Sequence, residues 1–71
     1  MNIDFNAVEI NKEIIDLFSF YLENGFSAQG AIETLRYEIF VKHNDWFYSL
    51  SEEQQWEVRG VLKSLELVHL N

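Results

Sequence analysis

The sequence predicts an all-α fold, a small bundle of three helices plus a short helical turn. Its 71 residues include no proline and three glycines, so little interrupts a helix. Apolar residues recur at spacings of three and four in three separate stretches, as in amphipathic helices. Serine, asparagine and glycine stand between these stretches, where helices begin and end. We therefore expect a single compact helical domain over residues 1–71.

The first helix is expected over residues 7–24. Asn6 suits the capping position at its start, and Glu9 places an acid in the first turn, where the helix dipole favours it. Gly25 fits the left-handed position that ends many helices, and Phe26 fits the hydrophobic contact that follows. The stripe predicted to face the core comprises Ile10, Ile14, Leu17, Phe18, Tyr21 and Leu22.

The second helix is expected over residues 28–42, with Ser27 as its cap and residues 43–45 as its end. Its core-facing stripe comprises Ala28, Ile32, Leu35 and Ile39. The aromatic segment 45–50 is predicted to form a short helical turn over one end of the bundle. Whether its aromatic side chains are buried or displayed stays open.

The third helix is expected over residues 52–70. Ser51 and Gln54 have the spacing of a capping box, and two glutamates follow where the helix dipole favours acid. The stripe predicted to face the core comprises Val58, Val61, Leu62, Leu65 and Val68.

Composition narrows the possible functions. Twelve acidic residues against five basic ones give a net charge of −7. Because phosphate binding depends on Lys and Arg, we expect no direct binding to nucleic acid or to anionic membranes. The charge favours a basic protein partner, or serves solubility alone. The chain has no cysteine, and it has neither a signal-peptide pattern nor a membrane-spanning apolar run. We therefore expect a cytoplasmic protein, in its own cell or in an infected host.

The sequence offers little for catalysis, so we expect no enzyme, no cofactor and no metal. Only His43 and His69 could act as bases near neutral pH, and no nucleophile motif accompanies them. Glu66 and His69 have the Glu-x-x-His spacing of di-iron helical bundles, but the second such pair is missing. A metal-dependent enzyme that uses these two residues is the least favoured alternative.

One side of the first helix, opposite its core stripe, is predicted to carry a row of acids with an aromatic residue in it. This acidic face comprises Glu9, Glu13, Asp16, Phe20 and Glu23. Neighbouring carboxylates lie about 6 Å apart on a helix, similar to phosphates along a nucleic-acid strand. The row could therefore fit a Lys/Arg groove built for nucleic acid, with Phe20 as an anchor. An ordinary solvated helix face is the alternative.

The third helix carries a second apolar row, opposite its core stripe. This outer seam comprises Trp56, Gly60, Lys63, Leu67 and Leu70. A glycine here costs the helix about 1 kcal/mol relative to alanine, which is understandable if another backbone approaches closely. The seam therefore predicts a homodimer or a complex with another protein. Cover by the 45–50 segment is the alternative.

In size and charge alone, the chain resembles the small inhibitor proteins that phages and mobile elements encode, among them anti-CRISPR proteins and DNA mimics. That resemblance implies a non-catalytic binding module that inhibits or regulates a basic, nucleic-acid-handling partner through the acidic face. The alternative is a homo-oligomeric structural or adaptor protein that uses the outer seam.

Overall fold

The structure is helical throughout, which confirms the predicted all-α class. It is a computed structural model, and it describes residues 9–70. The elements are α1 (Ile10–Glu23), α2 (Ala28–Tyr37), the π-helix η1 (Glu38–Lys42), α3 (Asn44–Ser49) and α4 (Glu52–His69). Residues 9–70 contain no β-strand and no helix with the length and apolar character needed to cross a membrane.

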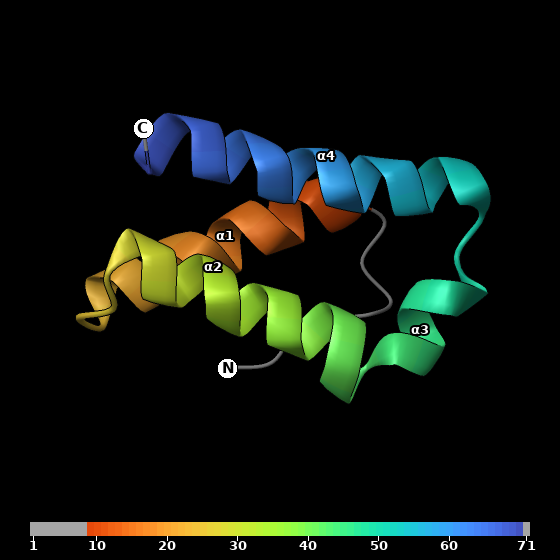
Figure 1. The fold of residues 1–71 in the computed structure, drawn as a ribbon, viewed down its shortest axis with the longest axis horizontal. Helices are drawn as coiled ribbons and strands as arrows, with labels where there is room; N and C mark the ends of the chain where they lie inside the picture. Colours follow the sequence, from red (N-terminus) through yellow and green to blue (C-terminus); the bar gives the residue numbers. More distant parts are fainter. Residues whose placement is uncertain (1–8, 71) are drawn as a thin grey trace.

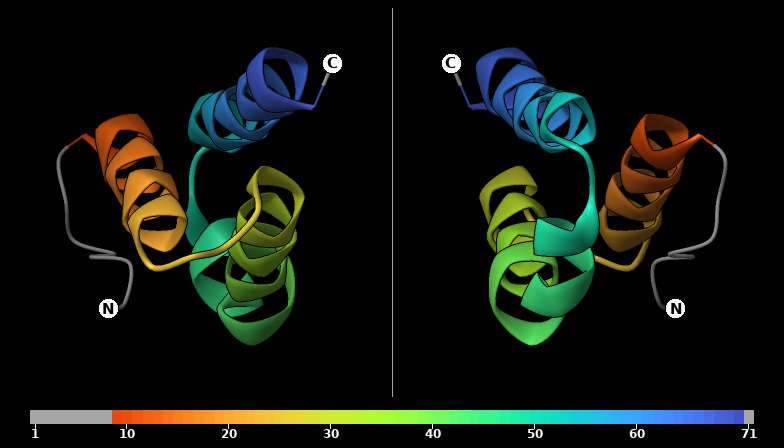
Figure 2. Two further views of the ribbon diagram at one scale, coloured as in Figure 1. Left: turned by 90° about the vertical axis from the view of Figure 1, so that its left-hand side faces the viewer. Right: turned by 90° about the vertical axis from the view of Figure 1, so that its right-hand side faces the viewer.

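Three helices surround one core, and the fourth closes an end. α1, α2 and α4 contact one another pairwise, and seen end-on they lie around a common centre (Figure 2). α3 lies where η1 ends and α4 begins (Figure 1). The buried core draws on all three predicted stripes and on α3: it comprises Ile14, Leu17, Phe18, Ala31, Ile32, Leu35, Ile39, Phe47, Val58, Leu62 and Leu65.

Two residues of the predicted stripes are exposed instead. Leu22 is 36% exposed and Val68 is 73% exposed. At 100° per residue, Leu22 is rotated about 80° from Ile14, and Val68 about 80° from Val58. Each therefore lies at the edge of its helix's buried face, where neighbouring helices no longer cover it.

The predicted helix ends are confirmed where local hydrogen bonding decides them. The Ser27 hydroxyl accepts a hydrogen bond from the Gly30 amide at 3.0 Å. Ser51 accepts from the Gln54 amide and Gln54 accepts from the Ser51 amide, which completes the capping box. Gly25 has a φ of +91°, the left-handed conformation expected after α1.

The start of the first helix and the winding of the second differ from the prediction. Glu9 has φ −105° and ψ 81°, and α1 begins at Ile10, whereas residues 7 and 8 of the predicted helix lie outside the described residues. Asn6, the predicted cap, lies outside the described residues. The second helix is α-helical only to Tyr37, and residues 38–42 form a π-helix whose last bond joins the His43 amide to the Glu38 carbonyl. At its other end, α4 stops at His69, with Leu70 as its cap.

Candidate protein-binding surfaces

Most of the acidic face of α1 is exposed, and a lysine side chain forms an ion pair with one of its acids. Glu9, Asp16 and Glu23 are exposed, whereas Glu13 is half-buried. Lys12, which sequence reasoning overlooked, places its Nζ 2.8 Å from Asp16 Oδ2. The hydrogen bond and charge of that carboxylate raise the Lys12 pKa above 10.5. The four-residue spacing of an ion pair on a helix could have revealed this contact.

Phe20 does not project freely from the acidic face. Its side chain is half-buried, and its ring stacks on that of Tyr21 with the centroids 6.1 Å apart. Tyr21 in turn stacks on Phe26 at 4.9 Å. Phe20 therefore belongs to an aromatic row at the end of α1, and only part of its surface could meet a partner.

The outer seam of α4 is open to solvent. Trp56 is 67% exposed, Leu67 54% and Leu70 45%, so the 45–50 segment does not cover Trp56. At Gly60 an added methyl group would meet no atom within 4 Å. Lys63 differs from the other members, because its ammonium lies toward Glu66 at 3.7 Å.

Trp56 lies in an acidic stretch of α4. Glu52 and Glu53, both exposed, lie four and three residues before it, so that they flank the indole on the helix surface. Glu57 follows it in the sequence and is also exposed, but it lies about 100° further round the helix. Trp56 also lines a hollow of about 410 Å³ with Glu52, Gln55 and Arg59.

A second hollow joins this stretch of α4 to the acidic face of α1. It measures about 480 Å³, and its lining includes Glu57 from α4 together with Glu9, Lys12 and Ile15 from the α1 side. Glu9 and Glu57 are far apart in the sequence, so only the packing of α1 against α4 brings them together. The acidic face and the Trp56 region are therefore adjacent surfaces.

The aromatic segment predicted at 45–50 lies in α3, which spans Asn44–Ser49 with Leu50 as its cap, and it is partly buried. Phe47 is fully buried, with its ring edge-on to Phe40 at 4.9 Å. Trp46 is half-buried, and Tyr48 is 62% exposed. The segment thus contributes one anchor to the core and one aromatic ring to the surface.

A third hollow, the basic groove, was not foreseen from the sequence. It lies between the rod of α2 and η1 on one side and α4 on the other, and it measures about 440 Å³. Three cations and two aromatic rings line it: its residues are Arg36, Phe40, Tyr48, Arg59, Leu62 and Lys63.

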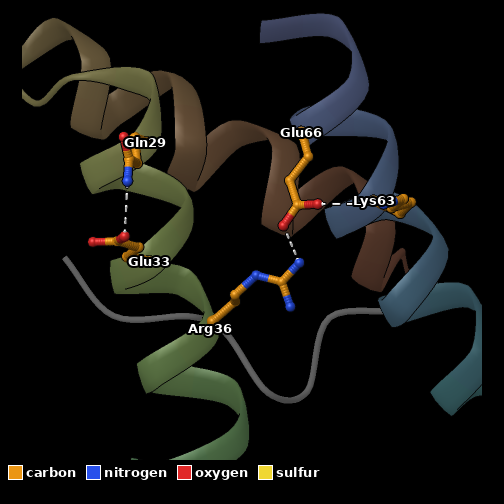
Figure 3. Close-up of polar contacts among 5 residues, drawn as sticks. All are labelled: Gln29, Glu33, Arg36, Lys63 and Glu66. Atoms are coloured by element: carbon orange, nitrogen blue, oxygen red, sulfur yellow. Dashed lines mark hydrogen bonds and ion pairs between the residues drawn. The ribbon is translucent and has the colours of Figure 1, made fainter. Parts of the chain in front are cut away.

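The two residues of the Glu-x-x-His pair on α4, Glu66 and His69, each contact other side chains. Arg36 reaches from α2 to hydrogen-bond Glu66, and Lys63 approaches the other carboxylate oxygen (Figure 3). The His69 ring packs against Phe18 at 4.8 Å. Within residues 9–70, no three His, Asp or Glu side chains gather as metal ligands would.

Comparison with known proteins finds no counterpart: no family model, no curated protein and no solved structure matches the chain.

Proposed function

We propose that this chain is a non-catalytic, acidic protein-binding module that engages a basic surface of a partner and so inhibits or regulates it. The observation that carries the proposal is Trp56, two-thirds exposed among flanking glutamates. The face of an indole attracts a Lys or Arg side chain. Carboxylates beside it pair with the same cation or with its neighbours. Large exposed aromatic residues are also the commonest anchors of protein interfaces.

The acidic face of α1 extends this surface. Glu9 and Glu57 line one hollow with a single cation, Lys12, so a net negative charge joins α4 to α1. Such a field mainly accelerates encounter with a basic partner and favours it over neutral ones. A protein groove built for nucleic acid is a partner of this kind, as with the DNA mimics that the chain resembles in size and charge. The cysteine-free composition is compatible with action in the cytoplasm.

Tryptophan fluorescence tests the proposal with an octa-arginine peptide as the basic probe. In a Trp46→Phe background, Trp56 is the only tryptophan, so its emission reports binding directly. We expect the peptide to shift or quench this emission, with an affinity that falls as salt concentration rises. Calorimetry should then show binding weakened about fivefold or more by Trp56→Ala, as for an anchor residue.

Two matched control substitutions distinguish binding at the Trp56 surface from attraction by the overall negative charge of the protein. Tyr37 on α2 is an exposed aromatic at 56%, and Tyr37→Ala should leave binding unchanged. Glu53→Gln should weaken binding more than Glu33→Gln, which removes the same charge from α2. Two results would contradict the proposal. One is an affinity that does not change with salt concentration, and the other is an equal loss of affinity in Trp56→Ala, Tyr37→Ala, Glu53→Gln and Glu33→Gln.

A second candidate function is self-association through α4, as a structural or adaptor protein. The exposed Leu67 and Leu70 and the open space at Gly60 favour it, because a helix of a second copy could approach closely there. Light scattering on the wild type and on Leu67→Ser tests it. A dimer that becomes a folded monomer in the variant supports this function, and a wild-type monomer at all concentrations excludes it.

A further inference from the structure

The basic groove concentrates positive charge in an acidic protein. Of the five Lys and Arg residues in the chain, Arg36, Arg59 and Lys63 line this one groove. Its volume of about 440 Å³ falls within the range of ligand pockets, about 300–1,000 Å³. Glu66 contacts two of these cations and Glu52 lines the adjoining hollow with Arg59, so three cations face two carboxylates.

Arg59 is the cation best placed to bind an anion. Its guanidinium lies over the rings of Phe40 and Phe47, at 5.6 and 5.3 Å from their centroids. Stacking on aromatic faces restricts the guanidinium while its N–H edge can still donate. Within residues 9–70, each of the other four Lys and Arg side chains contacts a carboxylate, whereas Arg59 makes no ion pair.

Two of the cations that line the groove already contact a carboxylate. Arg36 from α2 and Lys63 from α4 approach opposite oxygens of Glu66 (Figure 3). Their convergence shows that both side chains reach a carboxylate at this place. A second carboxylate, at Arg59, would extend the same arrangement along α4.

The remaining lining is apolar and aromatic. Phe40 is presented by the π-helix, a distortion that often occurs at functional sites. Leu62 is buried at the base, and Tyr48 is 62% exposed at the rim. A ligand that fills the groove therefore needs an apolar group beside its negative charge.

We propose that the basic groove binds a short acidic segment of a protein, through a carboxylate on Arg59 and an apolar side chain against Phe40 and Tyr48. The planar edge of a guanidinium matches a carboxylate with two parallel hydrogen bonds. A long polyanion such as nucleic acid would also meet the acidic surfaces of α1 and α4, which repel it. A short segment remains within the groove. Arg59 lines both this groove and the Trp56 hollow, so the two sites adjoin, and their charge preferences are opposite.

Calorimetry with two blocked peptides tests the proposal. One carries the sequence Leu-Glu-Glu-Leu and the other Leu-Gln-Gln-Leu, so that only the carboxylates differ. We expect the glutamate peptide alone to bind, and Arg59→Lys to weaken it about tenfold, because lysine keeps the charge but loses the paired hydrogen bonds. Glu66→Gln should strengthen binding, since it frees Arg36 and Lys63 for the peptide.

Lys12→Ala is the control, since it removes a positive charge from α1, outside the groove, and should leave binding unchanged. Lys63→Met provides a second groove variant if Arg59→Lys folds poorly by circular dichroism, and it should weaken binding as well. The proposal is overturned if the glutamine peptide binds equally, or if Lys12→Ala weakens binding as much as Arg59→Lys. It is also overturned if inorganic phosphate or an oligonucleotide binds while the glutamate peptide does not.

Discussion

Gly60 is a residue at which helix stability favours alanine, whereas the proposed self-association through α4 would favour glycine. Its surroundings have room for a methyl group, and alanine is favoured over glycine inside a helix. We therefore expect Gly60→Ala to raise the free energy of unfolding by about 0.5–1 kcal/mol, measured by urea denaturation of the monomer. If light scattering shows that Gly60→Ala associates less than the wild type while its monomer is more stable, Gly60 lies in a self-interface.

Gly25 gives the contrasting result and serves as the control. Its φ of +91° places the backbone in a region that side chains disfavour, although no atom lies within 4 Å of an added methyl group. Gly25→Ala should therefore lower the free energy of unfolding by about 1 kcal/mol. Equal effects at the two glycines would show that backbone conformation does not distinguish them.

The Tyr21 phenol makes the free energy of unfolding vary with pH in the alkaline range. Burial, and secondly the charge of Glu38, raise the Tyr21 pKa above 10.0, because both disfavour the tyrosinate. The folded protein thus holds the phenolic proton more tightly than the unfolded chain does. This stabilisation is complete below the unfolded pKa of 10.0 and is lost as pH rises through the folded pKa.

We therefore expect the free energy of unfolding to fall as pH rises above about 10, with a smaller fall in Tyr21→Phe. Lys12, whose pKa is also raised, acts in the same direction, so the variant should retain part of the fall. Urea denaturation at several alkaline pH values measures both proteins, with Tyr37→Phe as the control. Identical pH dependence in Tyr21→Phe and the wild type would refute the assignment.

Among the helices, the start of α4 depends on its capping box. The Ser51 hydroxyl accepts from the Gln54 amide at 3.1 Å, and this amide would otherwise lack a partner. Ser51→Ala should lower the free energy of unfolding by about 1 kcal/mol in thermal or urea denaturation. Ser64→Ala, at an exposed position inside the same helix, should have little effect. A cost at Ser64 equal to that at Ser51 would argue against capping.

Helix boundaries could be predicted where a few neighbouring residues decide them. Ser27, Ser51 and Gly25 act through hydrogen bonds or backbone angles within one turn, and all three predictions are confirmed. The π-helix could not be predicted in this way, because the same residues can wind as an α-helix. Local sequence therefore does not distinguish the two windings.

Across the whole molecule, stability depends on a small core. A domain of this size gains about 3–5 kcal/mol from its core, and truncation of a buried phenylalanine costs a similar amount. Because Phe47 is fully buried, we expect Phe47→Ala to remain largely unfolded, as judged by circular dichroism and amide dispersion in NMR spectra. Its neighbour Tyr48 is 62% exposed, and Tyr48→Ala should stay folded. A cooperative melting transition in Phe47→Ala would contradict this expectation.

The candidate surfaces were predictable to different degrees. The exposed seam followed from helical periodicity, since residues opposite a core stripe face outward unless another element covers them. The basic groove did not, because α2, η1, α3 and α4 each contribute to it. Arg36 and Lys63 become neighbours only when α2 packs against α4. Single-helix patterns contain no signal for such a site.

The π-helix at 38–42 has a consequence for how the chain length can vary. A π-turn holds about one residue more than an α-turn, so removal of one residue here allows the backbone to close ordinary i→i−4 hydrogen bonds. Elsewhere in α2 or α4, the same deletion would rotate every later side chain by about 100° away from the core. Within these helices, the segment around Val41, which is 59% exposed, is therefore the place that can best absorb a one-residue deletion.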